Sequence, residues 1–333
     1  MTYRLASHLN PDLFSPSCAK EANRIGFGKA LKEVGSKDER VVALCADLTE
    51  STRIIDFKDA FPERFFEMGI SEQSMASVAS GMAAMGKIPF MASYAMFSPG
   101  RNWEQIRTTI AYNDVPVKII GAHAGVSVGP DGATHQAIED VALMRTIPNM
   151  VVLSPSDTLE AARATMTLAT TTEPSYMRLA REATPVVTTA ATPFAIGKAE
   201  MYLFRDEAHT KKVGIIASGT ILFEALSAAR TLNENGIGAS VMNLATIKPL
   251  DTAAVLTFAE EHNVLVTVEE HQRAGGMGSA VVEYLSTVRP TKVIRLGIDD
   301  AFGQSGTMEE LWRYFGLDAA SIVLETKRIL GVS

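Results

Sequence analysis

The residues IPFMASYAMFSPGRNWEQIRTTIAYNDVPVKIIGAH, numbers 88–123, decide the fold class. They open with a β-rich apolar run at 88–92, pass through a helical pattern at 102–112, and close with a second apolar run at 117–123. Two short apolar strands joined by a helix make the βαβ unit of a parallel sheet. The sequence therefore predicts an α/β protein whose parallel sheet is covered by helices on both faces.

The same alternation continues in both directions along the chain. In the first half we predict helices over residues 21–34, 72–85 and 159–169, and strands over 41–45, 151–154 and 175–179. A second series has strands at 213–217, 239–243, 264–269 and 293–296, with helices at 222–235, 252–262 and 277–286. No fixed-period repeat interrupts these series, so solenoid and array architectures are excluded.

The division into domains follows from length and from two unusual segments. A chain of 333 residues exceeds a typical domain of about 100–200 residues, so we expect two compact units. Residues 184–192, TPVVTTAAT, are rich in Thr and predict a linker between a domain at 17–183 and a domain at 193–333. Residues 1–16 are polar and predict an arm that is held by another part of the protein or stays mobile, with order beginning near Ser17.

Composition and charge limit the possible partners and location. The net charge of −7 argues against nucleic acid or anionic membranes as partners, because both require clustered Lys and Arg. Cys18 and Cys45 lack the spacing of a disulfide or metal motif, which fits a reduced compartment. The N-terminus does not resemble a signal peptide, and no apolar run reaches the roughly 18 residues that span a bilayer. We expect a cytoplasmic protein.

Glu72 stands out within FFEMGISEQSMASVASGMAAMG, residues 65–86. The Ser71 hydroxyl is a candidate helix cap, and the Ala, Met and Ser pattern after it is typical of a tightly packed helix. Spacing alone favours a plain interpretation of Glu72, because an acid in the first turn of a helix interacts favourably with the helix dipole.

The surrounding phrases favour a catalytic interpretation. GISEQ at 69–73, DGATHQAIEDVALMR at 131–145 and IPNMVVLSPSD at 147–157 are long, consecutive and correctly ordered. This succession resembles transketolase, and the resemblance covers its pyrimidine-binding and C-terminal domains from about residue 17 to 330. It implies two α/β/α domains. The family's diphosphate domain, with its GDG motif and downstream Asn, has no counterpart in these 333 residues, so the chain resembles half of a split enzyme.

The resemblance also implies a cofactor, thiamine diphosphate. The family residue that matches Glu72 hydrogen-bonds N1′ of the aminopyrimidine and favours the imino tautomer, whose nitrogen takes the proton from C2. Phe97 and Tyr94 match an aromatic cluster against the pyrimidine, although burial statistics alone favour the core for either ring. Asp47 matches an acid near the cofactor, and a strand-end cap is its plain alternative. Mg²⁺ or Ca²⁺ is expected on the partner subunit.

A sugar phosphate is the implied substrate. His135, assigned a catalytic role beside Glu72, and Asp131 match residues that hydrogen-bond the donor's hydroxyl groups. The phosphate contacts of the family match Arg24, Ser51, His123 and Arg181. Each of these could separately be a surface, turn or salt-bridge residue. Together they imply a phosphate pocket in an acidic protein.

The implied assembly is a heterotetramer of two such chains and two N-terminal, diphosphate-binding chains. Three alternatives stay open: a deoxyxylulose phosphate synthase, the beta subunit of a 2-oxo acid dehydrogenase, and a noncatalytic regulatory module of the same fold. His123 disfavours the synthase, which tends to have Asp-Arg where this chain has Ala122-His123. His271 and the glycines that follow it, Gly275, Gly276 and Gly278, are interpreted as structural residues of a C-terminal domain that serves assembly.

Overall fold

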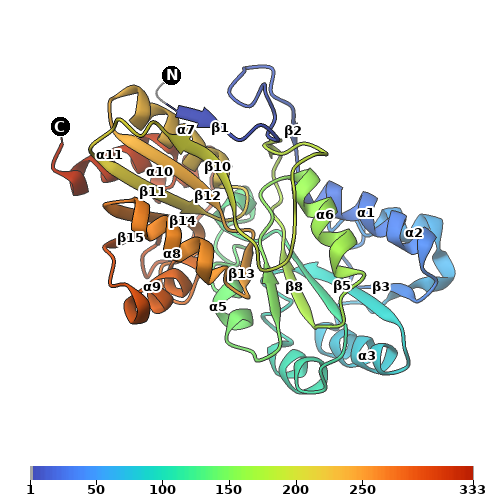
Figure 1. Ribbon diagram of the computed structural model, residues 1–333. Coiled ribbons are helices and arrows are strands. Elements are labelled where there is room, and N and C mark those ends of the chain that lie inside the picture. The colour runs from blue at the N-terminus through green and yellow to red at the C-terminus, as the bar shows by residue number, and fades with distance from the viewer. Residues whose placement is uncertain (1–2, 333) are drawn as a thin grey trace.

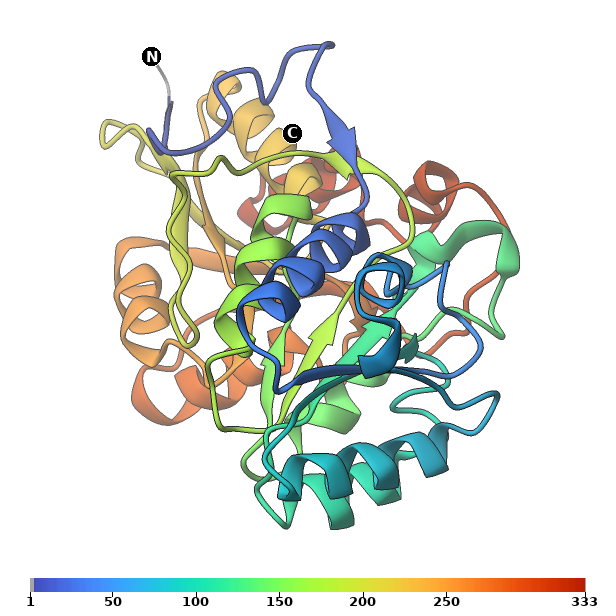
Figure 2. The ribbon, with the colours of Figure 1, turned by 90° about the vertical axis from the view of Figure 1, so that its right-hand side faces the viewer.

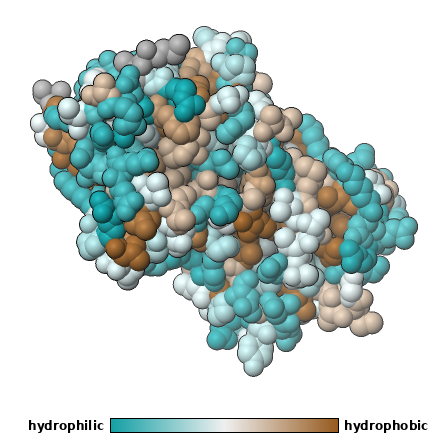
Figure 3. Space-filling view, in the orientation of Figure 1, coloured by the Kyte–Doolittle hydropathy of each residue, from teal (hydrophilic) through white to brown (hydrophobic). Residues whose placement is uncertain are grey.

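The computed structural model describes residues 3–332, and it confirms the α/β fold class. Two halves lie side by side, each built around one sheet with helices on both faces (Figure 1). Among the described residues, no helix is both long and apolar enough to cross a bilayer. On the face shown in Figure 3, apolar residues lie in small separate groups among polar ones.

The first half holds a seven-stranded sheet. Its order is β13 (Thr246–Lys248), β7 (Val151–Leu153), β8 (Ser175–Arg178), β6 (Lys118–Ala122), β5 (Ile88–Tyr94), β3 (Val41–Cys45) and β4 (Phe65–Glu67). All neighbouring pairs are parallel except β13 with β7. The carboxyl ends of six strands therefore meet at one edge. The antiparallel strand β13 comes from the second half of the chain and links the two halves.

Helices cover both faces of this sheet, as the sequence predicts. On one face α1 (Asn23–Lys37) and α6 (Thr158–Leu168) pack on Val41 and Ala43, and on the other α3 (Glu72–Ala84) packs on Val42 and Leu44 (Figure 2). Successive residues of β3 thus point to opposite faces, and both are buried. The remaining elements here are α2 (Ile55–Ala60), η1 (Pro62–Arg64), α4 (Trp103–Gln105), η2 (Ile106–Ala111), η3 (Val126–Asp131) and α5 (Asp140–Arg145).

The second half is built on a six-stranded sheet. Its order is β1 (Tyr3–Leu5), β10 (Glu200–Arg205), β12 (Gly238–Asn243), β11 (Lys212–Ala217), β14 (Val264–Gln272) and β15 (Val293–Ile298). Its helices are α7 (Leu222–Glu234), α8 (Thr252–Glu261), α9 (Met277–Val288), α10 (Met308–Tyr314) and α11 (Ala319–Leu330). One hydrophobic cluster joins α3 of the first half to α8 and α9 of the second, so the two halves share part of their core.

Residues 3–16 correct one expectation. The prediction that order begins near Ser17 is wrong for them, because β1 pairs antiparallel with β10 and the side chains of Leu9 and Leu13 are buried. The arm is held by the second half of the same chain. The residues predicted as a linker also pair: β9 (Thr184–Pro185) bonds to β2 (Lys20–Glu21). In residues 3–16 and 184–192 the apolar residues are spaced among polar ones, so the sequence shows no strand pattern in either segment.

Candidate active site

The site residues predicted from sequence follow the carboxyl ends of the parallel strands. Asp47 comes two residues after β3, Tyr94 ends β5, His123 follows β6 and Arg181 comes three residues after β8. The chain leaving β4 reaches Glu72 within five residues. In α/β sheets of this kind, ligands bind outside the carboxyl ends of the strands. Topology alone therefore brings these residues to one edge.

Four of the site residues predicted from sequence form an aromatic cluster: Tyr94, Phe97, His123 and His135. The rings of Tyr94 and His123 stack with centroids 3.9 Å apart and planes at 20°. Phe97 stacks near Tyr94 at 6.0 Å, and His135 meets Phe97 edge-on at 5.5 Å. Residues up to 41 positions apart in sequence thus line one surface.

His123 has the features of a functional residue. Its side chain is 3% exposed, its Nδ1 makes no hydrogen bond within residues 3–332, and its backbone φ is +54°. A buried nitrogen without a hydrogen-bond partner and a left-handed backbone conformation both lower stability, and such features cluster at functional sites. Burial lowers the pKa of His123 to about 3, with further lowering by Arg24, Arg181 and His135. The imidazole is therefore neutral at pH 7.

Two arginines lie beside this cluster. Arg24 donates to the backbone carbonyls of Arg181 (Nε, 3.1 Å) and Ser51 (Nη1, 2.9 Å). Arg181 donates through Nη1 to the carbonyl of Val128 (2.7 Å) and to Asp131 Oδ1 (3.2 Å). The structure thus connects Arg24, Ser51, Arg181 and Asp131. Burial lowers the pKa of Arg24, and the charge of Arg53 and Arg181 lowers it further. Carboxylates pair with Arg53 and Arg181, whereas Arg24 forms no salt bridge within residues 3–332, so its charge is available to an anion.

Glu72 begins α3, and its side chain is 3% exposed. It borders a cavity of about 480 Å³ lined by residues 70–74 and Arg101. Arg101 Nη1 donates to both carboxylate oxygens, at 3.0 and 3.2 Å. Ser71 occupies the N-cap position as expected, but its hydroxyl makes no capping hydrogen bond, so that prediction is wrong.

Arg101 is a site residue that the sequence reasoning missed. Besides binding Glu72, its guanidinium carbon lies 4.2 Å from the centre of the Phe97 ring. It therefore joins the carboxylate to the aromatic cluster, and the site is continuous from Glu72 to the arginine corner. The irregular segment SPGRN at 98–102 was the available signal, because it separates a strand from a helix at this edge.

Asp47 is placed differently from the others. It is exposed, its φ is +56°, and it shares no hydrogen bond or aromatic contact with the other predicted residues in the described part of the chain. Its backbone N–H donates to Glu67 Oε1 at 2.8 Å. Glu67, also missed from sequence, further accepts from Thr49 Oγ1 (2.8 Å) and the N–H of Gly69 (3.1 Å). Glu67 thus fixes the loops that follow β3 and β4.

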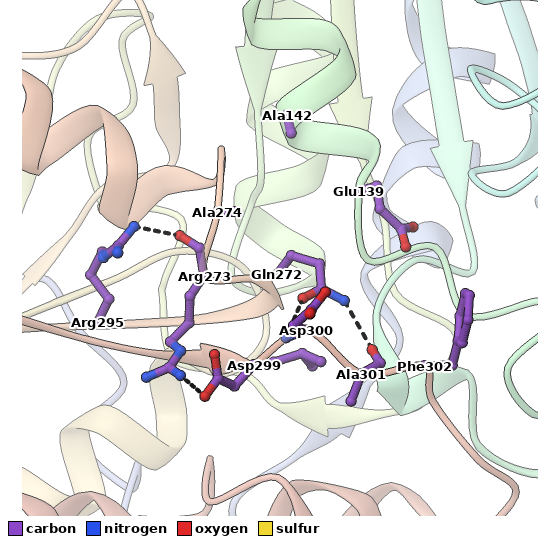
Figure 4. Close-up of a pocket in the computed structure, with 11 residues that line it drawn as sticks. Glu139, Ala142, Gln272, Arg273, Ala274, Arg295, Asp299, Asp300, Ala301 and Phe302 are labelled. Carbon is purple, nitrogen blue, oxygen red and sulfur yellow. Dashed lines mark hydrogen bonds and ion pairs between the residues drawn. The ribbon is translucent and has the colours of Figure 1, made fainter.

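A larger cavity, of about 730 Å³, lies between the two halves of the chain. Figure 4 shows Glu139 and Ala142 of the first half facing Gln272, Arg273 and the segment 299–302 of the second. None of the predicted site residues lines it. Within residues 3–332, no group of three or more His, Cys, Asp or Glu side chains is arranged to hold a metal ion.

Comparisons with known proteins agree with this geometry. Residues 19–186 match the model of the transketolase pyrimidine binding domain, and residues 204–322 match that of the transketolase C-terminal domain. The chain belongs to the transketolase family. It corresponds to the C-terminal section of a transketolase, the two domains that its sequence resembles.

Similar transketolase chains include separate subunits of nearly the same length. A putative transketolase C-terminal section of Methanocaldococcus jannaschii is 43% identical, over 92% of this chain and 95% of that one. A 6-deoxy-6-sulfo-D-fructose transketolase subunit of Clostridium sp. is 38% identical, over 88% and 89%. A solved structure described as a split gene transketolase, inactive beta4 tetramer, is 39% identical with a TM-score of 0.84, over 94% and 99%.

Transketolase membership implies the use of thiamine diphosphate. The residues present fit its pyrimidine end: a buried carboxylate opens onto a cavity, and an aromatic ring lies on the other side of Arg101.

Proposed function

We propose that this chain is the pyrimidine-binding subunit of a two-chain transketolase that moves a two-carbon ketol unit from a ketose phosphate to an aldose phosphate. One observation carries the proposal. The buried carboxylate of Glu72, at the N-terminus of α3, lies on the same edge as the neutral His123 and the paired arginines. A proton-relay acid and an anion pocket at one edge suit a cofactor enzyme that handles phosphorylated sugars.

Glu72 and Phe97 would hold the aminopyrimidine. When bound, thiamine diphosphate supplies the nucleophilic carbon and accepts the electrons of the broken carbon–carbon bond. The Glu72 carboxyl group binds N1′ and holds or releases a proton there, while the Phe97 ring packs on the heterocycle. Arg101 has to move away for this, because its guanidinium lies between the Glu72 carboxylate and the Phe97 ring, where the pyrimidine would bind. In this proposal Tyr94 packs beside Phe97 in the aromatic cluster, and Asp47 lies at the entrance to the cofactor site.

The sugar would lie between the aromatic cluster and the arginines. His135 and Asp131 orient the donor's hydroxyl groups, and His135 is in reach of the same rings that hold the cofactor. His123 is neutral, so it donates a hydrogen bond toward the phosphate without bringing a further positive charge beside the arginines. Arg24, Arg181 and the Ser51 hydroxyl bind the phosphate, for which forked guanidinium groups are well suited.

A second chain would complete the site. This partner is an N-terminal transketolase subunit that holds the diphosphate and Mg²⁺ or Ca²⁺, in a tetramer of two chains of each kind. The relative named as a C-terminal section, and the solved beta4 tetramer described as inactive, support the need for a partner. The cytoplasm is the proposed location.

Reconstitution tests the proposal. The chain, its candidate partner, and a mixture of both would be assayed with thiamine diphosphate and Mg²⁺ for ketol transfer between sugar phosphates. The donor panel should include 6-deoxy-6-sulfofructose and apulose 4-phosphate, because two relatives carry those names. We expect activity from the mixture alone. A mixture that binds cofactor but instead forms 1-deoxy-D-xylulose 5-phosphate would favour the synthase, to which a relative of 35% identity belongs.

A further inference from the structure

The loop between β6 and α5 presents Asp131 and His135, but it has little regular structure of its own. Only the short η3 lies within it. Gly125, Gly129 and Gly132 have φ values of 84°, 79° and 75°, a region that favours glycine. Glycine also loses the most conformational freedom on folding, so ordering such a loop is costly. Contacts from outside must hold Asp131 and His135 in place.

The strongest of these contacts comes from the second half of the chain. Glu270, in β14, is 3% exposed, and its Oε1 accepts the backbone N–H of Ser127 (2.9 Å) and the indole N–H of Trp312 (2.7 Å). Its Oε2 lies 3.0 Å from the Ser127 hydroxyl and 3.4 Å from that of Thr220. Both N–H groups can only donate, so they depend on this acceptor. One buried carboxyl group thereby ties the loop to α10 and to the residues before α7.

A second contact reinforces the first. Gln136 Nε2 donates to the carbonyl oxygens of Val126 (3.1 Å) and Gly129 (3.3 Å) inside the loop, and to that of Gln304 (2.9 Å) outside it. Gln304 lies in the segment that joins β15 to α10. Figure 4 shows Gln272 holding the start of that segment, with bonds to Ala301 and Asp300. The loop therefore rests on two anchored parts of the C-terminal domain.

We infer that Glu270 is a positioning residue for sugar binding: from the C-terminal domain, it holds the loop that presents Asp131 and His135. The inference rests on the proposed function for what the loop binds. It gives the C-terminal domain a part in substrate recognition, beyond the assembly role expected from sequence. Glu270 touches the loop and α10, so it acts through the loop backbone.

The chain provides a matched control one residue away. Glu269 is also 3% exposed, and its carboxylate accepts two backbone N–H groups, those of Met277 (2.6 Å) and Gly278 (2.8 Å). These belong to the start of α9. Since neighbouring residues of a strand point to opposite faces, Glu269 holds α9 and Glu270 holds the loop. Replacing either acid removes a buried acceptor from the same strand, but only Glu270 contacts the loop.

Three variants separate positioning from general destabilisation. Glu270→Gln keeps a carbonyl oxygen for the two N–H donors, and its amide can donate to the two hydroxyls, so we expect near-normal behaviour. Glu270→Met leaves both donors buried without an acceptor. In the two-chain complex we expect it to raise KM for the donor ketose about 5–30-fold, as for loss of about 1–2 kcal/mol of hydrogen bonding. Glu269→Met should lower the melting temperature similarly and leave that KM within about twofold.

Amide hydrogen exchange of the chain alone provides a readout independent of activity. Exchange in residues 124–136 should quicken about tenfold in Glu270→Met and stay unchanged in Glu269→Met, in which residues 273–285 quicken instead. If Glu270→Met does not fold, Ser127→Ala removes one donor and should give a smaller change in the same segment. Equal effects of Glu269→Met and Glu270→Met on residues 124–136 would overturn the inference. A wild-type complex without ketol transfer would refute the proposed function, while exchange would still decide the role of Glu270.

Discussion

Arg101 lies where the proposed cofactor should bind, so replacing it should strengthen cofactor binding. Arg101→Met keeps an apolar side chain over Phe97 but removes the charge that pairs with Glu72. Because this pair has to break before the carboxyl group can meet the pyrimidine, the variant should bind thiamine diphosphate more tightly than the wild type.

The size of the effect follows from exposure. The Glu72 side chain is 3% exposed and that of Arg101 is 48% exposed. Hydrogen bonds to charged groups contribute about 1.5–3 kcal/mol, and fully exposed pairs contribute about 0–1 kcal/mol. For this half-exposed pair we expect about 1–2 kcal/mol. The dissociation constant of thiamine diphosphate should then fall about 5–30-fold, and the free energy of unfolding of the chain alone should fall by about 1–2 kcal/mol.

Cofactor titration of the two-chain complex, followed by tryptophan fluorescence or circular dichroism, measures this directly. Arg107→Met is the control, because Arg107 is exposed and makes no ion pair in the described part of the chain. The reasoning is refuted if Arg101→Met binds the cofactor no more tightly than Arg107→Met does.

Three further predictions test other parts of the account. His123 has a pKa of about 3 in the folded chain and about 6.5 when unfolded, so its contribution to stability is complete above pH 6.5 and is lost as pH falls toward 3. In urea unfolding at a series of pH values, His123→Asn should flatten this decline by about 1.4 kcal/mol per pH unit; parallel curves for the two proteins would contradict it. Arg24→Met should raise KM for an aldose phosphate about 10–100-fold and change KM for the unphosphorylated aldose far less, whereas equal increases would point to general damage. Leu13→Ala should lower the free energy of unfolding by about 2–5 kcal/mol, because Leu13 is fully buried; a loss below about 0.5 kcal/mol would mean that the arm contributes little.

The fold could be predicted where burial on both faces leaves a continuous apolar run. Val41–Cys45 forms β3 with the predicted bounds, and β6 and β11 lie within one residue of theirs. Strand β10 was overlooked, although the residues MYLF at 201–204 form a short apolar run that is typical of a strand. The strand β1 and the buried Leu13 could not be predicted, because their partners lie about 200 residues away in sequence.

From sequence, only the site residues that match family motifs could be predicted. The resemblance named His123 and Arg24, but the burial that keeps His123 neutral depends on packing between three segments. Arg101 is 29 residues from Glu72, and no local pattern pairs them. Glu270 was overlooked because its donors come from residues 127 and 312, which only the folded chain brings together. Local sequence patterns therefore do not predict hydrogen bonds between buried groups that lie far apart in the sequence.

The central claim is that Glu72 relays the proton at the pyrimidine end of thiamine diphosphate, between this chain and its partner. The most direct test is the rate at which the C2 proton of the cofactor exchanges with deuterium in the reconstituted complex, measured by quenched-flow NMR. The account predicts that Glu72→Gln binds the partner and the cofactor but slows this exchange about 10²–10⁴-fold, as for loss of a general acid–base group. Exchange at the wild-type rate in an intact Glu72→Gln complex would contradict it.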